Sequence, residues 1–277
     1  MTIGVRAHDF GSGDFAYFDS VIRKIASVGY QSLQLAPAKS ITEIGGMEHL
    51  NEEHLARIKN ILLKHQIIVS VLGCYLDFTA EDEEVRKKSV ALFKRYIKYA
   101  KFLSAKMIAT ETSYGIVTDE QREEAMGYVV EAFQEIMPIA EEEGVLVAIE
   151  PVAHHALNTP ELTRELLETI SSDNLKILYD QTNLLTPKTV ADDAIMFERA
   201  KKYLGDDVIA LHIKNFVVKD REKQMVALDS GVVNFPAILE WASSLTADGK
   251  RNVEIIREDS TDAYMKADLA YIKSFVR

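Results

Sequence analysis

Four side chains that can bind a divalent metal ion each lie at or near the end of a short apolar run. They are Glu150 in LVAIE, Asp180 in LKILYD, His212 in VIALHIK and Glu258 in NVEIIRE. Together they form a mostly oxygen ligand set, which suits Mn²⁺, Mg²⁺ or Co²⁺ and tolerates Zn²⁺ or Fe²⁺. Taken singly, each has an ordinary structural explanation: a helix cap, a salt bridge, an Asx turn or a satisfied core histidine. Taken together, they predict one metal site wherever the fold brings the ends of these runs into contact.

Short apolar runs alternate along the chain with longer amphipathic segments. Several runs are nearly continuous in valine, isoleucine and leucine, which is typical of strands covered on both faces in a parallel sheet. The expected strands are residues 2–7, 32–36, 67–73, 107–112, 146–150, 175–180, 208–214 and 252–258. The clearest helical periodicities cover residues 14–29, 51–66, 81–105, 119–144, 159–172 and 192–205. Asn51 and Thr159 are the expected N-caps of two of these helices.

Strict alternation of strand and helix predicts parallel strands joined by right-handed crossovers. Eight such units in 277 residues fit a closed (β/α)₈ TIM barrel, with residues 1–277 forming a single domain. An open doubly wound sheet is the alternative, but the first turn, AHDFGSGDF, lacks the G-x-G-x-x-G spacing. Residues 215–234 fit neither a strand nor a helix, and are interpreted as an ordered loop over the functional face.

In such a barrel the functional face lies at the carboxyl ends of the strands, where the four candidate ligands would meet. The last strand leaves one ambiguity, because Glu254, Ile256 and Glu258 share one face by period-two alternation. Glu258 is the preferred ligand, since it lies at the tip and is followed by the polar residues DST. Glu254 is the alternative if the strand is shorter.

Five further polar residues are candidates for substrate binding at the same face. His8 follows the first strand, Glu111 ends the fourth, and Lys214 follows the seventh; the other two are His155 and Asn183. Each also has an ordinary explanation, since polar residues frequently serve in turns and salt bridges. Of the adjacent histidines at 154 and 155, one is expected to point inward and the other outward.

The composition argues against several classes of partner. The formal net charge of -11 excludes a general attraction to nucleic acid or to anionic membranes. The single cysteine, Cys74, rules out an internal disulfide and fits a reducing compartment. The N-terminus lacks the pattern of a signal peptide, and no apolar run has the length of a membrane helix. A cytoplasmic protein acting on a small molecule is therefore expected.

At these residues the whole chain resembles the xylose isomerase-like TIM barrels. The most specific segments are VAIEP, YDQTNLL, LHIKN and the closing RED, and GVVNFPAIL resembles the family's loop into the seventh helix. The resemblance implies one divalent ion, Mn, Mg, Co or Zn, held by Glu150, Asp180, His212 and Glu258. It also implies a small-molecule substrate that is a sugar, a sugar phosphate or a polyol. Since members are often dimers or tetramers, a homo-oligomer is a further expectation.

The chemistry that the resemblance implies is proton transfer beside the metal. The ion would polarise an α-hydroxy carbonyl substrate, while Glu150 and Glu258 would remove and return the proton, as in an isomerase or epimerase. A dehydratase of an inosose or of 3-dehydroshikimate is the alternative on the same site, and a barrel that only binds a sugar is a third. Two departures argue against a ketose 3-epimerase in particular: Ala156 replaces a further glutamate, and the basic residue after His212 is Lys214 rather than arginine.

Overall fold

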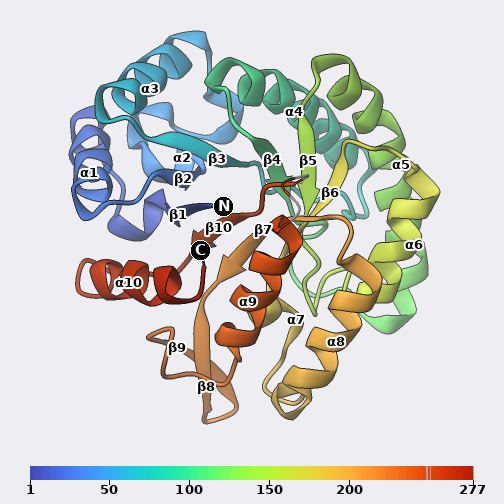
Figure 1. The fold of residues 1–277 in the computed structure, drawn as a ribbon. Coiled ribbons are helices and arrows are strands. Elements are labelled where there is room, and N and C mark those ends of the chain that lie inside the picture. Colours follow the sequence, from blue (N-terminus) through green and yellow to red (C-terminus); the bar gives the residue numbers. More distant parts are fainter. Residues whose placement is uncertain (248, 250, 277) are drawn as a thin grey trace.

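The computed structural model describes every residue except 248, 250 and 277, and forms a closed barrel of parallel strands (Figure 1). The order around the barrel is β1-β10-β7-β6-β5-β4-β3-β2. The barrel strands are β1 (Thr2–Arg6), β2 (Ser32–Leu35), β3 (Ile68–Gly73), β4 (Met107–Thr110), β5 (Leu146–Ile149), β6 (Leu175–Tyr179), β7 (Val208–Ile213) and β10 (Glu254–Arg257). The predicted TIM barrel and each of its predicted strands are confirmed.

Helices surround the barrel and cover the outer face of the strands (Figure 1). They are α1 (Phe15–Val28), α2 (Pro37–Ser40), α3 (Glu52–His65), α4 (Glu83–Leu103), α5 (Asp119–Glu143), α6 (Pro160–Ile170), α7 (Gln181–Leu184), α8 (Asp193–Leu204), α9 (Phe235–Thr246) and α10 (Met265–Phe275). Asn51 and Thr159 cap α3 and α6 as predicted, since each side chain accepts a hydrogen bond from a backbone N–H in the first turn. Within the described residues, no helix combines the length and apolar character needed to cross a membrane.

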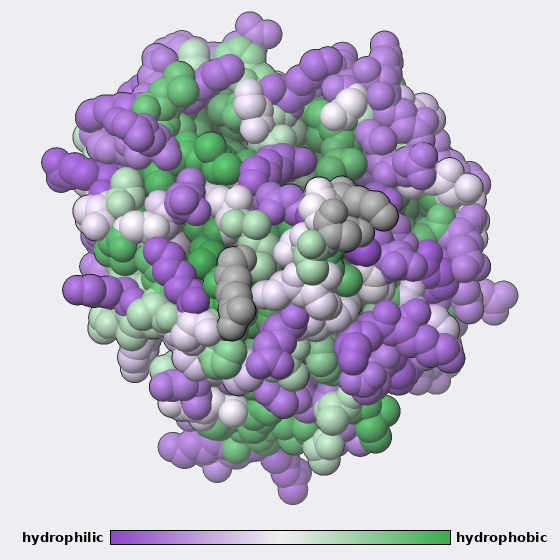
Figure 2. Space-filling view, viewed as in Figure 1, coloured by the Kyte–Doolittle hydropathy of each residue, from purple (hydrophilic) through white to green (hydrophobic). Residues whose placement is uncertain are grey.

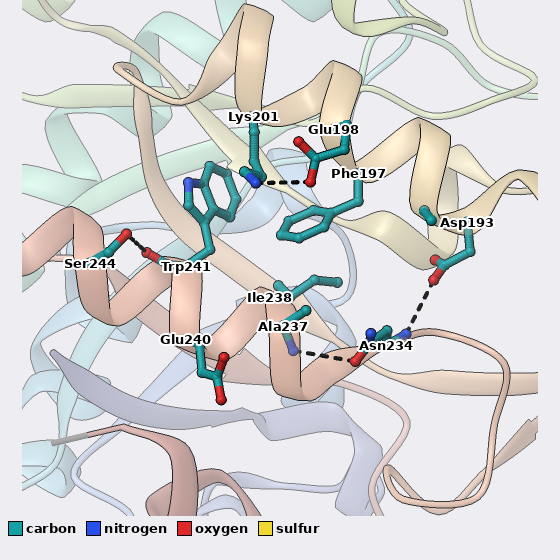
Figure 3. A pocket seen from close by; sticks show the side chains of 11 residues that line it. Asp193, Phe197, Glu198, Lys201, Asn234, Ala237, Ile238, Glu240, Trp241 and Ser244 are labelled. Carbon is teal, nitrogen blue, oxygen red and sulfur yellow. Dashed lines mark hydrogen bonds and ion pairs between the residues drawn. The ribbon is translucent and has the colours of Figure 1, made fainter.

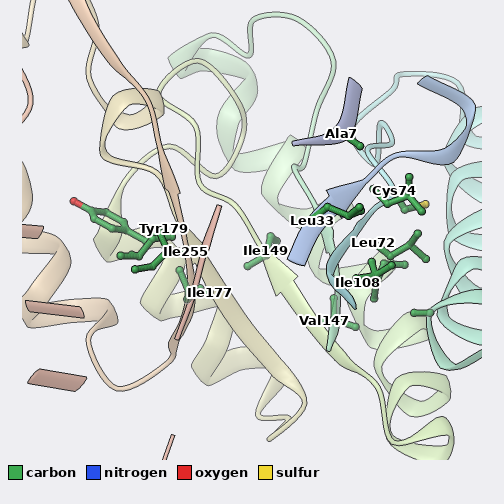
Figure 4. Close-up of a cluster of buried hydrophobic side chains, with 14 of the residues drawn as sticks. Ala7, Leu33, Leu72, Cys74, Ile108, Val147, Ile149, Ile177, Tyr179 and Ile255 are labelled. Atoms are coloured by element: carbon green, nitrogen blue, oxygen red, sulfur yellow. The ribbon is translucent and has the colours of Figure 1, made fainter. Parts of the chain in front are cut away.

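Alternate residues of each strand face opposite sides of the sheet, so the core has two parts. Outward-facing side chains such as Leu72, Ile108 and Ile177 pack between the strands and the helices (Figure 4). The inward-facing set is smaller and includes Ala109, Ala148 and Ala210, among others. Hydrophilic side chains cover most of the outline of the molecule, where the helices lie (Figure 2). The apolar interior thus supports a rigid set of strand ends.

The segment predicted as an ordered loop after β7 contains an antiparallel hairpin, so that prediction is wrong for residues 215–226. Its strands are β8 (Asn215–Lys219) and β9 (Glu222–Val226), which pair along their whole length. Asp220 and Arg221 form the two-residue turn, and both have left-handed backbone angles, with φ of 53° and 66°. Such a turn matches the twist of the two strands that it joins. The charged sequence KDREK hides this strand signal.

Candidate active site

Three of the four predicted metal ligands converge at the carboxyl ends of neighbouring strands. Glu150 follows β5, Asp180 follows β6, and His212 lies near the end of β7, and these strands are adjacent in the barrel. One ligand atom from each residue lies within 4.8 Å of the other two, and all three side chains are buried. His212 Nδ1 is 3.2 Å from Glu150 Oε2 and 3.9 Å from Asp180 Oδ2. Parallel register therefore brings together residues separated by about thirty positions in sequence.

The three facing atoms share a second property: they are buried and make no hydrogen bond of acceptable geometry. This holds for Glu150 Oε2, Asp180 Oδ2 and His212 Nδ1. Asp180 Oδ2 is ion-paired with Lys214 Nζ at 2.9 Å, whereas, among the described residues, Glu150 Oε2 and His212 Nδ1 face only each other and Asp180. Leaving a buried polar atom unsatisfied costs about 1–3 kcal/mol, and more for a charged group. A single divalent cation would satisfy all three atoms at once. Two carboxylate oxygens and one imidazole nitrogen are suitable donors for Mn²⁺, Mg²⁺, Co²⁺ or Zn²⁺, so the residues present fit the predicted metal.

Hydrogen bonds to the second oxygen of each carboxylate orient Glu150 and Asp180. Asn183 Nδ2 donates a hydrogen bond of 2.6 Å to Glu150 Oε1. Asp180 Oδ1 accepts a hydrogen bond of 3.0 Å from the backbone N–H of Asn183 and so caps the short helix α7. Each carboxylate therefore has one oxygen fixed and one directed at His212. Asn183, predicted to bind substrate, orients Glu150 in this structure.

Gln34, which was not among the predicted site residues, orients the histidine. Its side chain is buried at the end of β2, and its Oε1 is hydrogen-bonded to His212 Nε2. Its amide nitrogen donates to Glu258 Oε1 at 3.1 Å and to the Tyr75 hydroxyl at 2.7 Å. Because that nitrogen faces a carboxylate, the amide oxygen must face His212 and accept its Nε2 proton. The Nδ1 lone pair then remains for a metal ion. The sequence contained one indication that Gln34 belongs to the site, because Gln34 is a polar residue between two leucines in the apolar run SLQLA.

Glu258 lies beside the three-residue cluster, on the opposite side of the His212 ring. Its Oε1 is 3.5 Å from His212 Nε2 and 3.0 Å from Arg6 Nη1, and its Oε2 is 2.6 Å from Lys214 Nζ. Burial raises the pKa of Glu258, but His212, Lys214 and Arg6 outweigh burial and hold that pKa well below its usual range. Glu258 is therefore ionised and neutralised by protein cations. Its predicted role as a fourth metal ligand remains a prediction.

Glu254, the alternative ligand in the last strand, lies at the other end of the barrel. It is the first residue of β10, and its carboxylate contacts Ser70 Oγ and Lys106 Nζ, each at 2.5 Å. Lys106 immediately precedes β4, so this pair closes the base of the barrel. The ambiguity is resolved in favour of Glu258 as the residue at the strand tips.

Lys214 supplies a buried positive charge next to the cluster. Its Nζ lies 2.9 Å from Asp180 Oδ2 and 2.6 Å from Glu258 Oε2. Burial lowers the pKa of Lys214, but the charges of Asp180 and Glu258 outweigh burial and hold this pKa well above its usual value. Lys214 therefore remains an ammonium ion and screens the two carboxylates from each other.

A pocket of about 270 Å³ opens from these residues. Lys214 and Glu258 line it, together with the predicted residues His8 and Glu111. Burial, and then the charge of Glu150, raise the pKa of Glu111 to about 8, so this carboxyl carries a proton at neutral pH. His155 is buried, as predicted for one member of the histidine pair, while His154 is exposed. The Nδ1 atom of His155 lies 3.5 Å from Glu111 Oε2, so His155 contacts Glu111.

A larger hollow of about 560 Å³ lies on the outside of the barrel between α8 and α9 (Figure 3). Its aromatic residues Phe197 and Trp241 pack edge to face, and Lys201 is paired with Glu198 at 2.9 Å. The hollow is larger than the pocket at the strand ends, but most of the polar groups drawn in it are bonded to one another. It has neither converging unsatisfied atoms nor a metal cluster among the described residues. The strand ends are therefore the candidate active site.

Comparisons with known proteins agree with this architecture. A family model described as xylose isomerase-like TIM barrel matches residues 22–275. An inosose isomerase from Bacillus licheniformis is 23% identical over 220 residues, or 76% of each chain. A xylose isomerase-like TIM barrel protein from Mycobacterium smegmatis, solved in complex with magnesium, has a TM-score of 0.77 at 15% identity, covering 99% of this chain and 96% of the other. A D-tagatose 3-epimerase-like protein has the same TM-score at 18% identity, covering 99% of this chain and 97% of the other. The chain therefore belongs to the xylose isomerase-like TIM barrel family.

Proposed function

We propose that this protein is a divalent-metal-dependent isomerase or epimerase of a sugar or polyol. The observation that carries the proposal is the convergence of three buried ligand atoms from Glu150, Asp180 and His212, none of which makes a hydrogen bond. The inosose isomerase and the D-tagatose 3-epimerase-like protein support the same reaction class. Glu150, Asp180 and His212 would hold the ion, with Glu258 as the expected fourth ligand.

When bound, the ion would polarise the carbonyl of an α-hydroxy ketone and lower the pKa of the adjacent C–H bond. The two catalytic glutamates lie on opposite sides of His212, Glu150 near Nδ1 and Glu258 near Nε2. In this proposal, a substrate that contacts both carboxylates loses a proton to one of them and regains a proton from the other. Return to the opposite face of the same carbon gives an epimer, and return to the neighbouring carbon gives an isomer.

The surrounding residues would maintain the protonation states that this exchange needs. Lys214 and Arg6 keep Glu258 ionised, as a general base requires. Burial raises the pKa of Glu111 to about 8, which favours its protonated form at neutral pH; in that form Glu111, which lines the same pocket, donates a hydrogen bond to a substrate oxygen. One ionised and one protonated carboxyl in a single pocket is an arrangement suited to acid–base chemistry.

A dehydratase is the second candidate, and one observation favours it. Loss of a β-hydroxyl group needs an acid near the leaving oxygen, and the protonated Glu111 lines the pocket. The two candidates share the first proton abstraction and differ only in the later steps. Analysis of the products separates them, since a dehydratase releases water and an epimerase or isomerase conserves the formula of its substrate.

The test is a screen of keto-sugars and inososes in D₂O with Mn²⁺-loaded protein. The proposal predicts substrate-dependent incorporation of deuterium at the carbon next to the carbonyl, lost in Glu150→Gln and Glu258→Gln. Glu165→Gln is the matched control, because Glu165 lies on the exposed face of α6. Exchange that persists in both active-site variants would refute the assigned roles of these glutamates.

A further inference from the structure

One hydrogen-bond donor in the pocket at the strand ends has no role in the proposed chemistry. It is the hydroxyl group of Tyr75, a residue that follows β3 and lines the pocket together with Gln34 and Glu258. Tyr75 is half-buried, whereas Gln34 and Glu258 are buried. The hydroxyl therefore lies at the boundary between the buried residues around His212 and the open part of the pocket.

The hydrogen bonds of Gln34 determine where the proton of this hydroxyl points. The Gln34 amide oxygen accepts from His212, so the amide nitrogen faces the other way. That nitrogen donates to Glu258 Oε1 at 3.1 Å and to the Tyr75 hydroxyl at 2.7 Å. An amide nitrogen is a donor only, so the Tyr75 oxygen must be the acceptor in this contact. Among the described residues, the hydroxyl donates to no protein group, so its proton remains for an acceptor in the pocket.

Contacts on several sides hold the Tyr75 side chain in place. The ring lies so close to the backbone of Gly73 that a Cβ atom there would be 2.7 Å from Cε2, so glycine leaves room for the ring. The ammonium group of Lys39 lies 5.3 Å from the ring centre. The Tyr114 hydroxyl donates to the backbone carbonyl oxygen of Tyr75 at 2.6 Å. A donor that is fixed before the ligand arrives needs little reorganisation to stabilise a developing charge.

The Tyr75 hydroxyl also keeps its proton. Burial raises its pKa well above the usual value, and the charges of Glu150 and Glu258 raise that pKa further. At neutral pH the hydroxyl is therefore a donor and not a base. Tyr75 and Glu258 contact the same amide nitrogen of Gln34, so a substrate that reaches the Glu258 carboxylate lies close to this donor.

We propose that Tyr75 is a further catalytic residue, which donates a hydrogen bond to the substrate oxygen that becomes negatively charged during proton transfer. The inference rests on the proposed function, because that reaction creates the charge. When a glutamate takes the proton, the electron pair of the C–H bond forms a carbon–carbon double bond and the carbonyl oxygen gains the negative charge. Tyr75 keeps its own proton throughout. A hydrogen bond to a charged acceptor is stronger than one to a neutral carbonyl, so Tyr75 favours the charged state over the bound substrate.

The test measures binding of acetohydroxamate to Mn²⁺-loaded protein by calorimetry. Two adjacent oxygens share the negative charge of this probe, as they do in an α-hydroxy ketone that has lost a proton. Tyr75→Phe deletes the hydroxyl and keeps the ring that packs on Gly73. We expect this variant to bind acetohydroxamate on the order of tenfold more weakly than the wild type. Its affinity for Mn²⁺ should be unchanged, because Gln34 still donates to Glu258.

Tyr99→Phe is the matched control, since the Tyr99 hydroxyl donates to the Leu50 carbonyl oxygen at 2.9 Å and lies outside the pocket. Both affinities should keep their wild-type values in this control. Equal binding of acetohydroxamate by the wild type and Tyr75→Phe would overturn the assignment, and so would a wild type that does not bind the probe. A parallel loss of Mn²⁺ affinity in Tyr75→Phe would also overturn it, because Tyr75 would then act through Gln34.

The deuterium-exchange assay separates this inference from the proposed function. Where the wild type exchanges a substrate, Tyr75→Phe should slow that exchange on the order of 100-fold. Exchange at the wild-type rate in Tyr75→Phe refutes the catalytic role of Tyr75 and leaves the proposed function standing. Weakened binding of acetohydroxamate in Tyr75→Phe, without exchange of any keto-sugar or inosose by the wild type, supports the donor and refutes the proposed function.

Discussion

Replacing Gln34 with leucine should weaken metal binding without removing any metal ligand. The substitution deletes the acceptor for His212 Nε2–H and the donor to Glu258, while leucine preserves most of the buried volume. The imidazole then loses the contact that fixes its tautomer and ring orientation. Loss of such a supporting contact typically reduces metal affinity about 10- to 100-fold, or roughly 1.4–2.7 kcal/mol. The unpaired Nε2–H adds a destabilisation of about 1–3 kcal/mol to the folded state.

The assay is competition between the protein and a chelator for Mn²⁺, with folding checked by circular dichroism. Gln31→Leu is the control, because Gln31 is exposed just before the same strand. In the Mg²⁺-loaded wild type, ¹⁵N chemical shifts should show that His212 carries its proton on Nε2. A folded Gln34→Leu variant with wild-type affinity for Mn²⁺, or an Nδ1–H tautomer in the wild type, would refute the reasoning.

Two further predictions concern pH and the base of the barrel. Burial lowers the pKa of His212, but Glu258 and Glu150 outweigh burial and raise that pKa above its usual value, and a protonated imidazole cannot bind a metal ion. The affinity for Mn²⁺ should therefore fall as the pH falls through this raised pKa, and Mn²⁺ binding should release a proton. Calorimetry in buffers of different ionisation enthalpy would detect both effects. An affinity that does not change between about pH 6 and pH 8 would contradict this prediction. Glu254→Gln should lower the free energy of unfolding by about 2 kcal/mol, because it breaks the pair with Lys106, which is about one-third exposed, yet leave Mn²⁺ affinity unchanged. Urea denaturation measures the first effect, and a loss of metal affinity in this variant would make Glu254 a candidate ligand again.

The fold was predictable because each barrel strand carries its own signal. Strands covered on both faces are almost continuously apolar, and the helices between them have regular amphipathic periodicity. Among the described residues, four helices fell outside the predicted ranges: the short helices α2 and α7, and the longer helices α9 and α10. Helix α9 is apolar around most of its circumference, as in FPAILEWASSL, so its polar face is too narrow to reveal the helical period. The β8–β9 hairpin was not predicted because charged residues occupy most of its exposed positions.

The cluster of Glu150, Asp180 and His212 was predictable because parallel topology alone places successive strand ends side by side. Glu150, Asp180 and His212 needed no knowledge of side-chain contacts. The residues that orient this cluster could not be predicted without knowledge of side-chain contacts, since Gln34 and His212 are 178 positions apart in sequence. The engagement of Glu258 by Arg6 and Lys214 likewise depends on the closure of the barrel between β1 and β10. A single sequence contains the residue types of such a network but not the pairs.

The proposed chemistry depends on one divalent ion held by Glu150, Asp180 and His212 at the carboxyl ends of β5, β6 and β7. Anomalous diffraction from crystals soaked in Mn²⁺ would locate that ion. We expect one strong anomalous peak within bonding distance of Glu150 Oε2, Asp180 Oδ2 and His212 Nδ1, and no such peak in crystals of Glu150→Gln. A peak elsewhere in the barrel, or none at these atoms in the wild type under saturating Mn²⁺, would contradict the assignment of this metal site.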